Sequence, residues 1–182
     1  FLNGPRGTGF LYVNKKIRSI LDPLFIDMTS AKVMSKNKYK LKKNKPFLES
    51  FEFSPALKMA FTTAVENILN KGINNIMEKN IELSKYLRKN LNHNVHFYEN
   101  ENNLSAINTI SLRKGSVKEL FNYLKKNKIN TYVVNHEVSN LYFKKIKKKF
   151  LLRISFHYYN STDEIDYLVR IFNNFNKVKK ID

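Results

Sequence analysis

Apolar residues recur at helical spacing in two consecutive stretches near the middle of the chain. The first runs from Pro55 to about Asn70 and the second from Ile73 to about Leu91, each with its apolar side chains on or near one face. Ser54 precedes the first stretch as an N-cap candidate. Gly72 separates the stretches and suits the end of a helix, because glycine accepts positive φ. The pattern predicts two long helices in series.

Farther along, short runs rich in β-branched and aromatic residues alternate with further helical stretches. The predicted strands are 95–98, 107–112, 129–134 and 150–156, and the predicted helices are 117–126 and 162–178. Ser161 or Thr162 can cap the last helix, whose first turn carries the acidic residues Asp163, Glu164 and Asp166 at the positive end of the helix dipole. This order favours a small α/β sandwich with helices packed on a mainly antiparallel or mixed sheet.

The chain opens on a turn rich in glycine and proline, from Gly4 to Gly9, followed by the apolar run Phe10 to Val13. The run has the composition of a buried strand. From Leu21 to Pro46 the pattern is weak and indicates an irregular connection. The chain lacks a starting methionine and begins at the edge of a predicted strand, so we expect it to be a fragment of a longer protein.

Composition indicates a globular chain. Of its 182 residues 42% are hydrophobic, enough for one domain or for a small domain and a piece of another. No apolar run approaches the roughly 20 residues that span a bilayer, and no signal-peptide pattern opens the chain. We therefore expect a cytoplasmic location and no membrane partner.

The net charge of +18 comes mostly from lysine, which forms two runs, Lys36 to Lys45 and Lys144 to Lys149. Such runs raise the hypothesis of a basic nucleic-acid-binding module, whose affinity would fall steeply with salt. Asparagine and isoleucine are also abundant, however, which is typical of A+T-rich codon usage at ordinary surface positions. Lysine also suits bidentate recognition less well than arginine, and no helix-turn-helix, zinc-finger or RNA-binding motif accompanies the runs. Nucleic acid is therefore the less favoured partner.

The chain has no cysteine, which excludes disulfides, thiolate zinc sites and cysteine nucleophiles from these residues. His93, His136 and His157 lack the spacing of metal ligands, so no metal site is predicted.

Three separated segments occur in a fixed order: GPRGTGFLYV at residues 4–13, LESFEF at 48–53, and LRISFHYYN at 152–160 with DEID at 163–166. Together they resemble the class V aminotransferases and cysteine desulfurase-like enzymes, which are fold-type I enzymes dependent on pyridoxal 5'-phosphate (PLP). The resemblance implies the C-terminal part of a PLP-dependent transferase fold. Residues 1–50 would end the large cofactor-binding domain, with its last strand and a connection, and residues 51–182 would form the linking helices and the small α/β domain.

The resemblance implies a homodimer in which a lysine of the large domain holds PLP. That lysine should directly precede Phe1, so no catalytic residue is assigned in this chain. Arg153 matches the arginine that clamps the substrate α-carboxylate, a task that suits the paired donors of a guanidinium. The alternative is a strand arginine that pairs with a neighbouring acid.

Cofactor-binding candidates come from the first two segments. The opening loop would lie beside the cofactor, which makes Gly7 and Thr8 candidates, with Arg6 as a further group that could touch phosphate or substrate; the alternative is a turn that only leads into the strand. Many relatives carry a Gly-Thr pair in the middle segment that contacts the phosphate of the partner subunit's cofactor, whereas this chain has Ser50, Phe51 and Glu52. Ser50 remains a candidate hydroxyl donor. Asn160 before the last helix is expected to be structural.

The reactions of this family include amino transfer, cysteine desulfuration and C–S bond cleavage. Desulfurases carry an acceptor cysteine on a loop upstream of the carboxylate-binding arginine, and residues 133–152 contain none, which disfavours a persulfide-forming desulfurase. An aminotransferase-like activity on an amino-acid substrate, or a C–S lyase, remains, and the residues that decide lie upstream. A third possibility is a non-catalytic remnant that only folds or dimerises.

Overall fold

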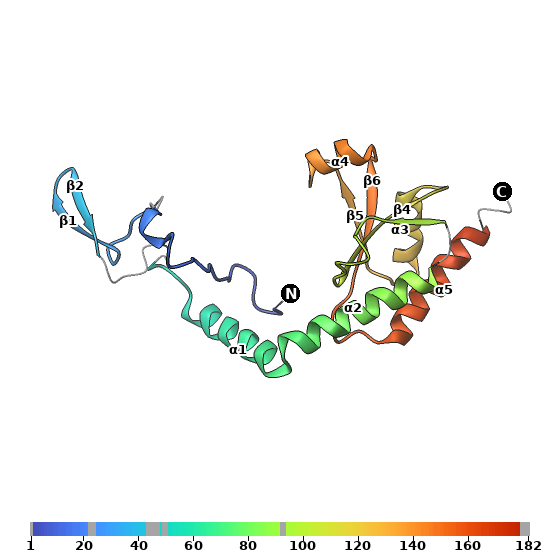
Figure 1. Cartoon of the computed structure of the whole chain (residues 1–182), viewed down its shortest axis with the longest axis horizontal. Coiled ribbons are helices and arrows are strands. Elements are labelled where there is room, and N and C mark those ends of the chain that lie inside the picture. The colour runs from blue at the N-terminus through green and yellow to red at the C-terminus, as the bar shows by residue number, and fades with distance from the viewer. Residues whose placement is uncertain (1, 22–24, 43–47, 49–50, 92–93, 179–182) are drawn as a thin grey trace. The chain divides into compact units, whose positions relative to one another are not determined.

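The computed structural model describes residues 2–21, 25–42, 48, 51–91 and 94–178 (Figure 1). The chain divides into two compact units, Phe1–Asn70 and Lys71–Asp182. The domain boundary that we place between residues 50 and 51 concerns the enzyme as a whole and stays a prediction.

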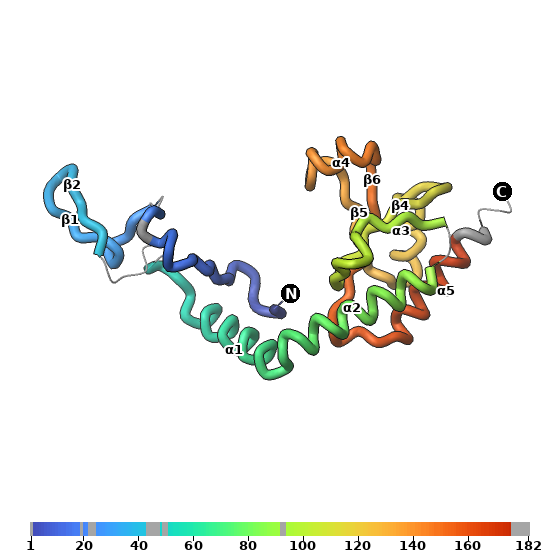
Figure 2. The backbone as a smooth tube through the Cα atoms, in the orientation of Figure 1, coloured from blue at the N-terminus to red at the C-terminus, as the bar shows by residue number. Residues whose placement is uncertain are grey.

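The first unit contains a β-hairpin and a long helix, whose path is easily followed in Figure 2. Strands β1 (Ala31–Ser35) and β2 (Lys38–Leu41) pair antiparallel, and a short 3-10 turn, η1, covers Arg18–Ile20. Helix α1 spans Pro55–Lys71. As predicted, it begins after Ser54, whose hydroxyl accepts a hydrogen bond from the Leu57 amide at 3.4 Å. Our expectation of an irregular connection from Leu21 to Pro46 was therefore wrong for the residues that form the hairpin.

The strand predicted from Phe10 to Val13 is not formed. Phe10, Leu11 and Tyr12 are 71–80% exposed, and this segment pairs with no strand in the described part of the unit. Strand composition produces a strand only where a neighbour offers backbone hydrogen bonds. The run instead borders a groove of about 1080 Å³ against α1, lined by Phe10, Leu11, Phe53, Leu57 and Phe61 among others.

Asp27 closes the base of the hairpin. Its Oδ1 accepts hydrogen bonds from Thr29 Oγ1 at 2.8 Å and from the Ser30 hydroxyl and amide at 2.9 Å, and its Oδ2 accepts one from the Phe51 amide at 2.7 Å. These bonds, with those from the Thr29 and Ser30 side chains foremost, hold the pKa of the carboxyl well below its usual range. One carboxylate thus ties the segment at Phe51 to the hairpin.

We expect Asp27 to stabilise this tie in a pH-dependent way. Because its folded pKa lies below the unfolded value of about 3.9, the stabilisation is complete above that pH and is lost as pH falls through the folded pKa. At neutral pH, Asp27→Ala should therefore reduce the hydrogen-exchange protection of the Phe51 amide, measured by NMR. Glu66→Ala, which removes an exposed carboxylate of the same unit, is the control. Equal protection of Phe51 in both variants would contradict the assignment.

The second unit is an antiparallel four-stranded sheet with helices. Its elements are α2 (Ile73–Asn90), β3 (Val95–Phe97), β4 (Ile107–Leu112), α3 (Val117–Lys126), β5 (Tyr132–Asn135), α4 (Asn140–Ile146), β6 (Phe150–Ser155) and α5 (Thr162–Val178). The strand order is β3-β4-β6-β5, so β6, which follows the other three strands in the sequence, lies between β4 and β5. The two helices in series and the antiparallel sandwich are confirmed. The strand predicted at 129–134 begins later, and α4 was not predicted.

The core lies where α2, α3 and α5 pack on one face of the sheet. Alternate strand residues point into it. The apolar residues of this core with no exposed surface are Leu83, Leu87, Ile110, Leu120, Leu124, Leu152 and Phe172. Figure 1 shows α2 beside α5, which pack against each other.

The two features predicted before α5, a helix cap at Ser161 and a structural role for Asn160, are both present. Ser161 Oγ accepts from the Glu164 amide at 3.3 Å, and Glu164 Oε2 accepts from the Ser161 amide at 2.8 Å, a reciprocal capping box. Asn160 donates to Glu164 Oε2 at 3.0 Å and accepts from the His157 amide at 2.7 Å. The Ser161 amide, and then Asn160, lower the pKa of Glu164. Asn160 therefore has the structural role that we expected.

Candidate functional site

The sheet face opposite α2, α3 and α5 carries a row of partly exposed side chains, one from each strand or its end. The Tyr98 amide donates to the Thr109 carbonyl at 3.0 Å, and Arg153 is paired in register with Thr109 on one side and with Tyr132 on the other. Residues opposite each other in a ladder share a face. Since Leu152 and Ile154 are buried in the core, Arg153 lies on the other face of β6.

Arg153 occupies the centre of this row, and its charge is not compensated by an acid. Its Cζ lies 5.1 Å from the centre of the Tyr132 ring. Within the described residues it makes no ion pair, so the alternative of a structural pair with a neighbouring acid finds no support here. Its Nε is buried without a hydrogen-bond partner, whereas neither Nη group is a buried atom without a partner, and neither makes a hydrogen bond to the described residues. The Nη groups are therefore not fully buried, and paired donors of this kind suit an anion.

A partly buried polar network supports the row from α2. Arg88 Nη2 contacts Glu99 Oε2 at 3.0 Å, and Arg88 Nε donates to Asn108 Oδ1 at 3.0 Å, which also accepts from Ser84 Oγ at 2.8 Å. Glu99 Oε1 accepts from the amide of Thr109 at 2.7 Å. The network thus fixes the backbone beside Arg153. Sequence reasoning missed it, although an arginine on the inner face of an amphipathic helix is a signal for a buried acidic partner.

Helix α4 covers one end of this face. Phe143 anchors the helix with 3% exposure, and the Tyr142 ring lies 6.4 Å from that of Tyr98, whose hydroxyl is 3.1 Å from Ser111 Oγ. Burial, followed by the negative charge of Glu99, raises the pKa of Tyr142. Tyr142 therefore stays neutral at physiological pH and adds no charge beside Tyr98.

The opening loop, which carries other predicted site residues, lies in the first unit. Gly7 has φ +82°, a value that favours glycine, and a Cβ there would meet no atom within 4 Å. The Thr8 hydroxyl donates its proton to the Pro5 carbonyl at 2.6 Å. In this arrangement it has no proton left for a phosphate oxygen. The cofactor roles of Gly7 and Thr8 stay predictions, and Ser50 lies outside the described residues.

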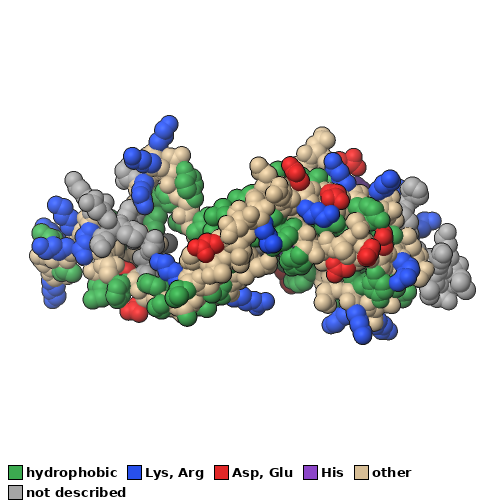
Figure 3. Space-filling view, turned by 90° about the horizontal axis from the view of Figure 1, so that it is seen from below, with side chains coloured by type: hydrophobic (Ala, Val, Ile, Leu, Met, Phe, Trp, Pro, Cys, Tyr) green, Lys and Arg blue, Asp and Glu red, His purple; other side chains and the backbone are tan. Residues whose placement is uncertain are grey.

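The described residues give little support for a metal site, a membrane span or a basic nucleic-acid-binding patch. Across the described part of the chain no cluster of three or more His, Asp or Glu side chains suits a metal ion. No helix in that part is long and apolar enough to cross a membrane. Figure 3 shows lysine and arginine side chains dispersed over the visible face with hydrophobic side chains between them.

Comparison with known families gives one match over most of the chain. A family model described as aminotransferase class-V matches residues 2–168. No curated protein matches the chain significantly.

Solved structures match the fold. The apo cysteine desulfurase of Thermococcus onnurineus NA1 matches with a TM-score of 0.80 and 18% identity, over 91% of this chain and 42% of that enzyme. Cysteine desulfurase CsdA of Escherichia coli matches with a TM-score of 0.83 and 15% identity, over 97% and 44%. The cystine C–S lyase C-DES, bound to its product cysteine persulfide, matches with a TM-score of 0.71 and 16% identity, over 94% and 43%.

These likenesses, all below 25% identity, show the fold alone, and they confirm the predicted fold class, a portion of the α/β fold of these enzymes. The chain spans 42–44% of the length of the three structures. A variant of the lyase holds glycine covalently linked to its PLP cofactor.

Proposed function

This chain belongs to the class V aminotransferase family, and we propose that it forms part of a PLP-dependent enzyme that acts on an amino-acid substrate. The family match confirms the resemblance that we drew from three sequence segments. The observation that carries the proposal is Arg153, whose guanidinium makes no ion pair with the described residues and lies on a central strand, on the sheet face opposite α2, α3 and α5.

The described residues fit the part of such a site that binds the substrate. PLP, when bound, supplies an electron sink that stabilises negative charge at the substrate α-carbon. The α-carboxylate of an amino acid needs paired, charge-assisted donors, which the Nη groups of Arg153 offer. Held by its carboxylate, the substrate would have its α-carbon oriented by this chain while other residues carry out proton transfer.

We favour an aminotransferase-like reaction, with C–S bond cleavage as the second candidate. Two observations together support the second candidate. The chain has no cysteine to accept sulfur, and it shares its fold with a C–S lyase whose product is cysteine persulfide. The whole protein loaded with PLP can be given L-cystine or, separately, L-alanine with 2-oxoglutarate. Pyruvate and ammonium from L-cystine would indicate a lyase, and glutamate from 2-oxoglutarate would indicate an aminotransferase.

Arg153→Ala should weaken amino-acid binding far more than PLP binding. A hydrogen bond to a charged group contributes about 1.5–3 kcal/mol, so we expect roughly a 10- to 100-fold loss of affinity for the amino acid in the whole protein. Spectrophotometric titration with substrate and with PLP measures the two affinities separately. Arg153→Lys keeps the charge but not the paired donors, and it should recover only part of the loss. Unchanged substrate affinity in Arg153→Ala would return Arg153 to a structural role.

Several further features of the enzyme remain proposals. They are a homodimer, a cytoplasmic location, a PLP-holding lysine outside this chain, and cofactor contacts from Gly7, Thr8 and Ser50. The resemblance supports all except the location, which rests on composition. A nucleic-acid-binding role for the lysine runs has only their charge in its favour.

A further inference from the structure

We propose that Tyr132 is a positioning residue for Arg153, and that it leaves the two Nη groups of the guanidinium to hold a substrate carboxylate end-on. This inference rests on the proposed function, because it takes the carboxylate of an amino acid as the ligand of Arg153. It goes beyond the proposed function in two ways. It names the residue that orients the guanidinium, and it names the nitrogens of the guanidinium that bind the carboxylate.

The first argument is the contact itself. Tyr132 is the direct cross-strand partner of Arg153, and the centre of its ring lies 5.1 Å from Arg153 Cζ, within the range of a cation–π interaction. No hydrogen bond or ion pair fixes this guanidinium among the described residues. Among these residues, the Tyr132 ring is therefore the contact that orients the charged end of the side chain.

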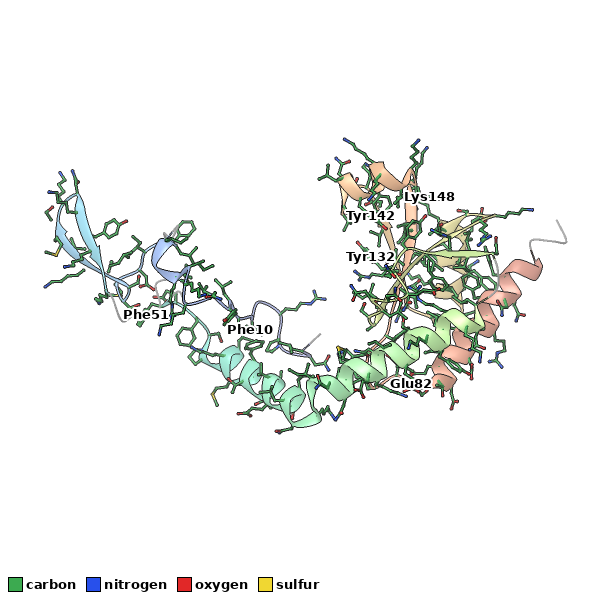
Figure 4. The ribbon with its side chains drawn as sticks, viewed as in Figure 1. Phe10, Phe51, Glu82, Tyr132, Tyr142 and Lys148 are labelled. Atoms are coloured by element: carbon green, nitrogen blue, oxygen red, sulfur yellow. The ribbon has the colours of Figure 1, made fainter. Side chains whose placement is uncertain are left out.

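The second argument is the exposure of Tyr132. The side chain is 51% exposed on edge strand β5, and Figure 4 shows it, like Tyr142, on the side of the unit opposite α5 in that view. Packing in the core therefore does not explain an aromatic residue at position 132. Its contact with the guanidinium of Arg153 does.

The third argument concerns which nitrogens remain available. Nε of Arg153 is buried and has no partner, so a carboxylate cannot reach it without movement of the side chain. The side-on geometry, which uses Nε and one Nη, is therefore closed, and the end-on geometry with both Nη groups is open. On the other flank of Arg153 lies Thr109, whose backbone Glu99 fixes. The strand on this side of Arg153 is thus fixed through its backbone.

Side-chain NMR of the 182-residue chain tests the proposal. L-alanine is titrated while the Nε–Hε and Nη–Hη signals of Arg153 are followed, with Arg170 as the internal reference, since its guanidinium lies 5.3 Å from another ring, that of Tyr167. We expect a saturable change at the Nη signals of Arg153 that exceeds the change at Nε. L-alaninamide, which lacks the carboxylate, should produce neither.

Variants of Tyr132 isolate its role. Tyr132→Phe keeps the ring and should bind L-alanine within about twofold of the wild type, whereas Tyr132→Ala should weaken binding about two- to fivefold, the range that an exposed cation–π contact supplies. Tyr132→Leu, which keeps bulk and removes the ring, should behave like Tyr132→Ala with little change in melting temperature. Tyr167→Ala, the matched loss of a ring beside Arg170, should leave binding at Arg153 unchanged.

Each contrary result has one meaning. Unchanged affinity in both Tyr132→Ala and Tyr132→Leu overturns the positioning role, and a change confined to Nε overturns the end-on geometry. In both cases the carboxylate role of Arg153 survives. If the wild type gives no saturable change at any Arg153 signal, the carboxylate role itself fails, and this inference fails with it.

Discussion

Phe172→Ala is expected to lower the free energy of unfolding of the second unit by about 3–5 kcal/mol, the largest effect of any single substitution that we propose. Phe172 lies on α5 with no exposed surface, within the core that joins α2, α3 and the sheet. Alanine would remove a whole ring and leave a cavity that surrounding backbone cannot easily fill. A loss of this size is a large part of the 5–15 kcal/mol that stabilises a typical domain.

Urea unfolding followed by circular dichroism measures this loss, since the α/β unit gives a strong signal. The control is Leu141→Ala, which truncates a side chain of the same unit that is 84% exposed and should change stability by about 0.5 kcal/mol or less. A loss below about 1 kcal/mol for Phe172→Ala would show that Phe172 is not part of a close-packed core.

Arg88→Met or Glu99→Gln should each cost about 2–3 kcal/mol, because each leaves a partly buried charge without its partner. The two side chains meet at 3.0 Å and are only 11% and 22% exposed. Removing both together should cost less than the sum of the single losses, since the double variant leaves no unpaired charge.

The chain contains a matched control for this prediction. Lys79 and Glu82 also meet at 3.0 Å, but their side chains are 38% and 61% exposed. Lys79→Met should change stability by about 0.5 kcal/mol or less, because solvent screens an exposed pair. The prediction concerns burial, so equal losses from the two pairs would contradict it.

The sequence predicted those elements best whose signals are local. Helices α3 and α5 begin and end at the predicted residues, because each carries its own cap, at Ser116 and at Ser161, and its own apolar stripe. Helix α4 has only two turns, and a single buried residue, Phe143, holds it in place. So short a stretch has too little periodicity for sequence reasoning to detect.

Sequence reasoning had less success where distant residues meet. The strand expected at Phe10 has no partner in the described part of its unit, and the hairpin at Ala31 has exposed side chains that give no alternating pattern. Arg153 was found through a family signature, but Tyr132 and Thr109 become its neighbours only through the register of three strands. Register depends on tertiary pairing, and a single sequence does not reveal it.

The central position of β6 also has a consequence for biosynthesis. Strands β4 and β5 both pair with β6 and not with each other, although β6 leaves the ribosome after both of them. Until then each has a bare backbone edge, which favours association with other chains. Long-range closure of this kind slows folding. Pairing with β6, the strand that carries Arg153, therefore covers one bare edge of β4 and one of β5, and it completes the row of side chains around Arg153 in the same step.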